Sequence, residues 1–81
     1  MNIEITPKFL KSLMLYKGLK INELYEFLGF NSVYEISYFY KVFKGKKPIS
    51  EPFNRAVNDK IENLLSTSEL ITVIKIQELL K

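Results

Sequence analysis

The residues best suited to chemistry in this sequence are lysines that follow a cluster of aromatic side chains. Residues 32–50, SVYEISYFYKVFKGKKPIS, place five aromatic rings within ten positions and then several lysines. Residues 36–47 hold four lysines and no acidic residue, whereas the rest of the chain sums to −1, so the net charge of +3 comes from this stretch. A local basic surface beside a helix is suited to binding phosphate groups. Cations at a helix end also favour the helix dipole and solubility, so the charge pattern alone leaves both interpretations open.

The functional groups that enzymes most often use are scarce in this chain. It has no histidine, the commonest general base near neutral pH, and no cysteine to act as a nucleophile or a thiolate ligand. Asp59 is the only aspartate and has no second carboxylate at a catalytic spacing, while Glu23 and Glu26 suit a solvated helix face. We therefore expect a protein that is not an enzyme and that uses neither a metal nor a cofactor.

Length and composition indicate a single small soluble domain over residues 1–81. With 47% hydrophobic and 26% charged residues, the chain has an ordinary globular composition near the lower size limit for independent folding. It has no apolar run of the roughly 18 residues that a membrane span needs. The N-terminal sequence MNIEITPKF also lacks the layout of a signal peptide. Because the absence of cysteine suits a reducing compartment, we expect a cytoplasmic protein. Because the sequence has no apolar run long enough to span a membrane, we expect no membrane partner.

Start and stop signals predict two short helices in the first part of the chain. Thr6 and Pro7 predict a helix start, with Thr6 as the cap and Pro7 at the first helical position. Gly18 predicts the end of this helix. A second helix is expected over residues 21–28, ended by Gly29.

A third helix is expected over residues 32–44, capped by Asn31 or Ser32. Steps of 100° per residue direct one set of side chains toward the core, namely Val33, Ile36, Phe39, Tyr40 and Phe43. The opposite set points to solvent and comprises Tyr34, Ser37, Tyr38, Lys41 and Lys44. Most of the aromatic rings are therefore expected in the core, while Tyr34 and Tyr38 project beside the lysines.

The remainder of the chain predicts two further helices. Ser50 caps a fourth helix with Pro52 in its first turn, and Ser66 with Glu69 matches a capping box for a fifth. The β-branched run ITVIKI leaves a strand as the alternative for the last segment. The predicted fold is all-α, a compact bundle of about five short helices.

The order of these elements, over about residues 7–65, resembles the helix-turn-helix domain of the phage lambda repressor and Cro type (XRE-like). That family has leucines before and within its second helix and a Leu-Gly pair at its end, and the matching positions here hold Leu19, Leu24, Leu28 and Gly29. A Gly-Lys-x-Pro sequence after the third helix is typical of the family and matches residues 45–48. The resemblance implies a lambda repressor-like fold and sequence-specific binding to double-stranded DNA by a small transcriptional regulator of phage or prophage type.

Three features depart from the family pattern. Ile21 stands where the family often has a phosphate-contacting Gln, and Tyr25 stands where a small residue packs in the second helix. The span from Gly29 to Gly45 is about four residues longer than usual, which either a longer helix or a longer turn would absorb. A weaker similarity links GF…SYFYKVFK to the second helix-turn-helix of AraC-type activators, which implies the same activity.

In helix-turn-helix proteins the second helix of the motif lies in the major groove and the preceding helix crosses the DNA backbone. The resemblance therefore implies a set of base-contact candidates on the third helix and at its start: Asn31, Ser32, Tyr34, Ser37, Tyr38 and Lys41. The phosphate-contact candidates are the lysines on its two flanks: Lys17, Lys20, Lys44, Lys46 and Lys47. Glu35 does not suit a DNA-facing surface, so it either accepts from a cytosine amine, pairs with a lysine, or indicates that this face does not bind DNA.

The apolar C-terminal helix, expected over residues 67–81, is either a candidate dimer interface or a terminal core helix. As an interface it would form a homodimer through Leu70, Ile71, Ile74, Leu79 and Leu80. The alternative function is a helix-turn-helix scaffold that binds another protein, such as a phage-type inhibitor or adaptor. Exposed tyrosines and an apolar last helix suit such an interface.

Overall fold

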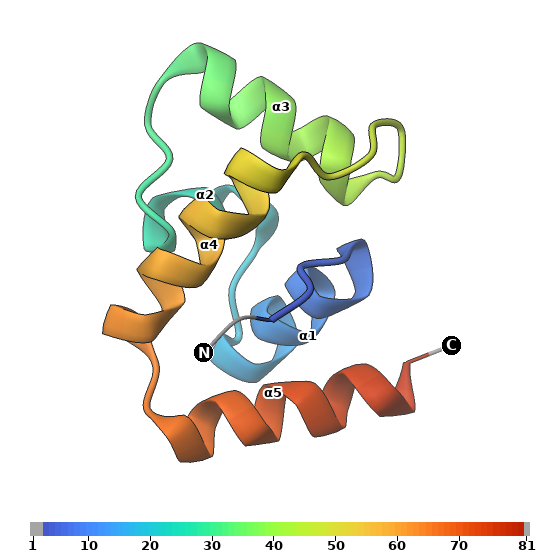
Figure 1. The fold of residues 1–81 in the computed structure, drawn as a ribbon, viewed down its shortest axis with the longest axis vertical. Helices are drawn as coiled ribbons and strands as arrows, with labels where there is room; N and C mark the ends of the chain where they lie inside the picture. The colour runs from blue at the N-terminus through green and yellow to red at the C-terminus, as the bar shows by residue number, and fades with distance from the viewer. Residues whose placement is uncertain (1–2, 81) are drawn as a thin grey trace.

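The computed structural model describes residues 3–80, and Met1, Asn2 and Lys81 lie outside the described part of the chain. These residues form five α-helices, and no strand occurs among them (Figure 1), so the expected all-α class is confirmed. The helices are α1 (Pro7–Lys17), α2 (Ile21–Phe27), α3 (Val33–Phe43), α4 (Glu51–Leu64) and α5 (Thr67–Leu79). The strand alternative for the last segment is therefore wrong.

Local capping signals set the helix ends. The Thr6 hydroxyl accepts a hydrogen bond from the Phe9 N–H, and α1 ends at Gly18, whose φ of 67° suits glycine. Ser50 and Ser66 cap α4 and α5 in the same way, each accepting from the N–H three residues later. The expected caps of these three helices are confirmed, because each signal involves only residues near it in sequence.

The helices pack around one core, with α3 at one end of the molecule and α5 at the other (Figure 1). α5 lies along α1, where Tyr16 donates a hydrogen bond to Glu69 at 3.4 Å. The largest fully buried side chains include Phe9, Leu13 and Phe39. Because α5 packs against α1, it leaves the outward side of α3 uncovered.

Aromatic rings connect α2, α3 and α4. Phe39 of α3 meets Tyr25 of α2 edge-on, with ring centroids 5.0 Å apart, and lies 6.0 Å from Phe53 of α4. Phe30, between α2 and α3, stacks on Phe53 at 5.8 Å. Tyr25 is buried, so a ring fills the position where the family resemblance implies a small residue. The Tyr25 ring therefore forms part of the contact between α2 and α3.

The connection between α2 and α3 runs over residues 28–32. It is longer than the three- or four-residue turn of a compact helix-turn-helix. Gly29, with a φ of 79°, lies at its start, and Ser32 caps α3 at its end. The sequence leaves a longer turn and a longer helix open as alternatives, and this connection accounts for only part of the roughly four extra residues between Gly29 and Gly45.

The expected inward face of α3 is partly wrong. Phe39 and Phe43 are buried as expected, and Val42, which was not expected on this face, is buried as well. Val33, however, is 81% exposed and Tyr40 also lies at the surface. The helix is rotated about its axis relative to the expectation, and this rotation changes which side chains a partner can reach.

Residues 3–5 are extended and dock along α4. The Ile3 and Ile5 N–H groups donate to the side-chain oxygens of Asn58 and Asn54, both at 2.7 Å. The Asn58 amide also donates to the Ile3 carbonyl at 2.8 Å. Two asparagines four residues apart on α4 therefore pair with the extended segment much as a neighbouring strand would.

Candidate nucleic-acid interface

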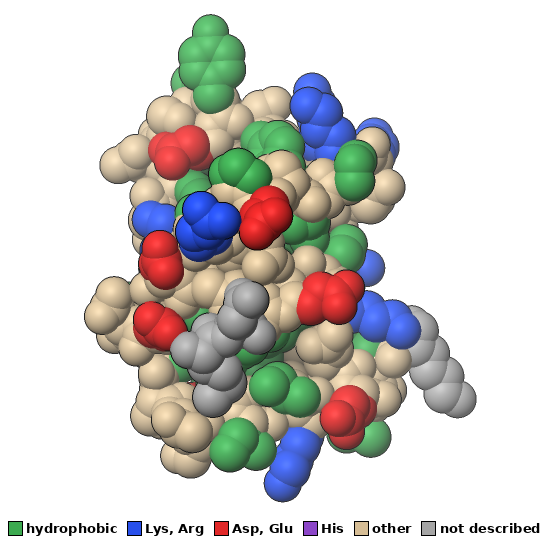
Figure 2. Space-filling view, in the orientation of Figure 1, with side chains coloured by type: hydrophobic (Ala, Val, Ile, Leu, Met, Phe, Trp, Pro, Cys, Tyr) green, Lys and Arg blue, Asp and Glu red, His purple; other side chains and the backbone are tan. Residues whose placement is uncertain are grey.

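The outer face of α3 comprises the six side chains that the rotation of the helix directs away from the core. All six are exposed: Val33, Tyr34, Ser37, Tyr40, Lys41 and Lys44. Figure 2 shows apolar side chains at the α3 end of the molecule, lysine side chains where α3 meets the following loop, and an acidic side chain near the start of α3. The face is apolar near its start and cationic near its end.

The structure separates the base-contact candidates into two groups. Tyr34, Ser37 and Lys41 lie on the outer face, and Asn31 is exposed just before the helix. Ser32 has a structural role, because its hydroxyl accepts a hydrogen bond from the Glu35 N–H at 3.1 Å and caps α3. The sixth candidate, Tyr38, is turned away from the outer face.

Tyr38 packs against α4 and holds the loop after α3. Its ring lies edge-on to Phe53, with centroids 5.1 Å apart. Its hydroxyl donates to the Pro48 carbonyl at 3.3 Å and accepts from the Ser50 N–H at 3.1 Å. The Lys47 ammonium lies 5.5 Å from the centre of the same ring. Tyr38 therefore positions the loop that carries the lysines.

We call residues 44–50 the cationic loop. Lys44, Lys46 and Lys47 are all exposed, and Gly45 makes the turn between them with a φ of 74°. The Lys46 N–H donates back to the Lys41 carbonyl at 2.8 Å, which closes the end of α3. The three lysines expected to bind phosphate thus lie together at one end of the outer face.

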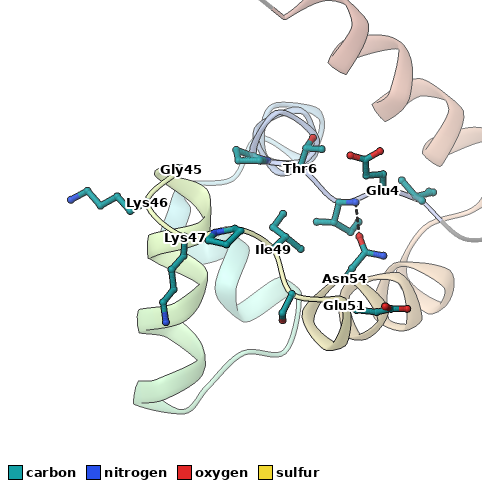
Figure 3. Close-up of a pocket in the computed structure, with 13 residues that line it drawn as sticks. Glu4, Thr6, Gly45, Lys46, Lys47, Ile49, Glu51 and Asn54 are labelled. Atoms are coloured by element: carbon teal, nitrogen blue, oxygen red, sulfur yellow. Dashed lines mark hydrogen bonds between the residues drawn. The ribbon is translucent and has the colours of Figure 1, made fainter.

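A pocket of about 900 Å³ lies between the cationic loop and residues 3–7. Figure 3 shows that the Lys46 and Lys47 side chains point away from this pocket, toward solvent. Asn54 lies on the opposite side of the pocket, where it binds the Ile5 N–H. The pocket is therefore a space behind the loop, and the lysines face outward from it.

Lys11 joins this basic end of the molecule, although it is not among the lysines predicted to contact phosphate. It lies on α1, and its ammonium is 5.8 Å from the centre of the Phe43 ring near the end of α3. Lys44 similarly lies 5.5 Å from the centre of the Tyr40 ring. The sequence offers no local signal for Lys11, because its position depends on how α1 packs against α3.

The other two phosphate-contact candidates lie away from the cationic loop. The Lys17 ammonium is 3.3 Å from a carboxylate oxygen of Glu69, so it joins α1 to α5. Lys20 is exposed just before α2, where its backbone N–H donates to Glu23 at 2.8 Å. Lys17 is therefore occupied by an ion pair, while the Lys20 side chain is at the surface.

Glu35 has a structural reason to lie at the start of α3. Its carboxylate accepts a hydrogen bond from the Ser32 N–H at 3.3 Å and completes a capping box. Hydrogen bonds from the Ser32 hydroxyl and backbone lower the pKa of Glu35 from its ordinary value, and the charge of Lys60 adds to this effect. Its negative charge also suits the helix N-terminus.

A shallow groove crosses the outer face of α3. It is lined by Val33, Ile36, Ser37, Tyr40 and Lys41, and its surface is almost entirely apolar.

None of the helices within residues 3–80 has the length and apolar content to cross a bilayer. The same residues contain no cluster of three side chains of the metal-ligating types.

The dimer-interface candidates on α5 differ in exposure. Leu70 is buried in the core and is not available to a partner, while Ile74 and Leu80 are half-buried. Ile71 is exposed, and Leu79 is 80% exposed. The surface that α5 offers to a second copy is therefore centred on Ile71 and Leu79.

No family model, curated protein or solved structure matches this chain. The lambda repressor-type resemblance consequently rests on the sequence pattern alone. What the chain binds must be argued from the chemistry of its own surface.

Proposed function

We propose that this protein is a sequence-specific double-stranded DNA-binding regulator that inserts α3 into the major groove. The observation that carries the proposal is an uncovered helix whose end, together with the loop after it, bears four lysines and no acidic residue over residues 36–47. A major groove of about 12 Å accommodates an α-helix, and lysines at the helix end suit the flanking phosphates.

In this arrangement the two ends of α3 have different roles. The first turns of a recognition helix contact base edges, which assigns Asn31, Tyr34, Ser37 and Lys41 to the bases. Lys44, Lys46 and Lys47 bind phosphate, and Lys11 reinforces them from α1. α2 crosses the backbone on the other side, where Lys20 is exposed.

One such domain offers few contacts, so specific binding calls for a homodimer on two half-sites. The exposed Ile71 and Leu79 of α5 are the residues of choice for the dimer contact. A palindromic site recovered by selection from a randomised duplex pool would support this symmetry, and a single asymmetric site would contradict it.

Salt-dependent binding to duplex DNA tests the proposed function. The Lys46→Ala, Lys47→Ala double variant should weaken binding to all sequences and reduce the slope of log K against log salt by about two. Lys75→Ala, which removes an exposed lysine on α5, is the matched control and should leave the slope near its original value. An unchanged slope in the double variant would remove the loop from the phosphate contacts.

A second function is favoured by the exposed Val33, Tyr34 and Tyr40. Protein interfaces are enriched in tyrosine, and an apolar helix face is suited to packing against another protein. As a protein-interaction module, the chain would show little affinity for random duplex even at low salt. The salt titration therefore separates the two functions.

A further inference from the structure

The outer face of α3 has much apolar surface and few hydrogen-bonding side chains. Val33 is 81% exposed and Tyr34 is 88% exposed. The helix sequence VYEISYFYKVF contains no Asn, Gln or Arg, so among the side chains that pair bidentately with base edges it offers only Lys41, with Asn31 just before the helix. Apart from the tyrosine hydroxyls, the polar groups on the face are those of Ser37 and two lysines. Beyond Lys41 and Asn31, hydrogen bonding therefore gives this helix few means to distinguish one base pair from another.

The groove on this face suits a small apolar group. Val33, Ile36 and Tyr40 supply its apolar walls, and Ser37 and Lys41 complete it. The apolar group that base pairs present in the major groove is the C5 methyl of thymine. Contact between this methyl and an apolar side chain is an established means of base discrimination.

Charge favours a nucleic acid as the occupant of the groove. Lys41 lines the groove itself, and Lys44 and the rest of the cationic loop continue from it. The one carboxylate of α3, on Glu35, is held at the helix start by Ser32. The groove thus suits a partner that combines small apolar projections with a polyanionic frame, as thymine-containing duplex DNA does.

We propose that the α3 groove takes thymine methyl groups, so that the chain selects A·T pairs beneath Val33 and Tyr40. This inference rests on the proposed function and adds the basis of its specificity. Val33 and Tyr40 are seven positions apart, which corresponds to about 10 Å along the helix and about three base-pair steps. The thymines should therefore lie within one run of about four base pairs.

The first test replaces thymine by uracil, which removes the methyl and keeps the pairing. A randomised duplex pool is selected for binding, and the enriched duplex is resynthesised with each thymine changed singly to uracil. We expect A·T pairs in each half-site and a loss of affinity of about four-fold for each methyl that α3 contacts.

The second test assigns the effect to the groove. Val33→Ala should lose the thymine preference at the base pair beneath Val33, because the side chain that contacts that methyl has been shortened, and should keep it at the base pair beneath Tyr40. Alanine favours helix formation, so this exposed substitution should leave the fold intact, which circular dichroism would check. Leu15→Ala, an exposed apolar position on α1, is the matched control and should keep the full preference for thymine.

The outcomes separate this inference from the function on which it rests. Enriched sites without A·T pairs, or uracil duplexes bound as tightly as thymine duplexes, would overturn the inference while duplex binding stands. An equal uracil penalty in the original protein and in Val33→Ala would overturn the assignment to the groove. Absence of binding to any duplex at low salt would overturn the inference and the proposed function together.

Discussion

At the scale of single residues, Tyr38 connects α3 to the loop that follows it. Its hydroxyl joins the Pro48 carbonyl and the Ser50 N–H, and its ring packs against Phe53. Tyr34, on the same helix, is almost fully exposed. Two tyrosines of α3 thus differ in environment: Tyr38 orders the loop through its hydroxyl, whereas Tyr34 exposes its ring to solvent.

Removing the Tyr38 hydroxyl should loosen the loop without disturbing the core. Tyr38→Phe keeps the ring against Phe53 but loses both hydrogen bonds, so we expect the free energy of unfolding to fall by about 1 kcal/mol. Urea denaturation would measure the change. Tyr34→Phe is the matched control and should have little effect, and equal effects of the two variants would show that the Tyr38 hydrogen bonds contribute nothing.

The sequence could not predict the role of Tyr38. Placing residues at 100° steps sorts side chains by polarity, and tyrosine, with an apolar ring and a polar hydroxyl, suits either side. The orientation of Tyr38 follows from a loop that returns past the helix to present Pro48 and Ser50. Tyr34, Ser37 and Lys41 were correctly expected on the outside, because none of the later residues that the structure describes, up to residue 80, folds over them.

At the scale of elements, helix ends were easier to predict than helix faces. The ends depend on caps only three residues apart, as for Ser32 with Glu35 and Ser66 with Glu69. The prediction of the inward face of α3 was partly wrong because apolar or aromatic residues occur all round this helix. The polarity pattern therefore does not determine which side of the helix faces the core. Val33 and Tyr40 lie outside only because the rings of α2 and α4 meet the helix at Phe39.

The capping box of α5 should make stability depend on acidic pH. The hydrogen bond from the Ser66 backbone N–H has the largest effect in lowering the pKa of Glu69 in the folded protein, and the hydrogen bond from the Lys17 side chain has the next largest. A lowered folded pKa means that the stabilisation is fully present above the ordinary value of 4.5 and is lost as the pH falls through the folded pKa.

We expect Glu69→Gln to flatten this dependence. Glutamine keeps the capping geometry but carries no charge, so the decline in the free energy of unfolding below the ordinary glutamate pKa should be smaller than in the original protein. Urea denaturation at a series of acidic pH values would measure it. A decline of the same steepness in both proteins would exclude Glu69 as its source.

At the scale of the whole molecule, the surface positions of the lysines follow from the packing of the helices. α5 lies along α1 on the side away from α3, which leaves the outer face of α3 and the cationic loop open together (Figure 1). The charge count of the sequence located the basic stretch correctly. It did not reveal Lys11 or the ion pair of Lys17, because both depend on contacts between helices.

Closure of the chain onto itself depends on Asn58, a buried polar residue of α4. Its side-chain oxygen accepts a hydrogen bond from the Ile3 N–H, and its side-chain nitrogen donates to the Ile3 and Asn54 carbonyls. Asn58→Ala would leave partly buried backbone groups without partners, so we expect a loss of about 2 kcal/mol in the free energy of unfolding. Urea denaturation would measure the loss, and hydrogen exchange at the Ile3 amide would locate it.

Asn63→Ala is the matched control for this variant. Asn63 lies on the same helix but is exposed, and its side chain donates only to the Asp59 carbonyl at 3.1 Å. Its replacement should change stability little. Slow exchange of the Ile3 amide in Asn58→Ala would show that another group holds the extended segment.

The pairing of residues 3–5 with α4 also has a consequence for synthesis on the ribosome. The hydrogen-bond partners of Ile3 and Ile5 lie 55 and 49 positions further along the chain. Residues 3–5 can therefore form these hydrogen bonds only after α4 has been synthesised, and until then the Ile5 side chain lacks this packing. In a nascent chain that stalls before α4, this apolar segment would be accessible to chaperones.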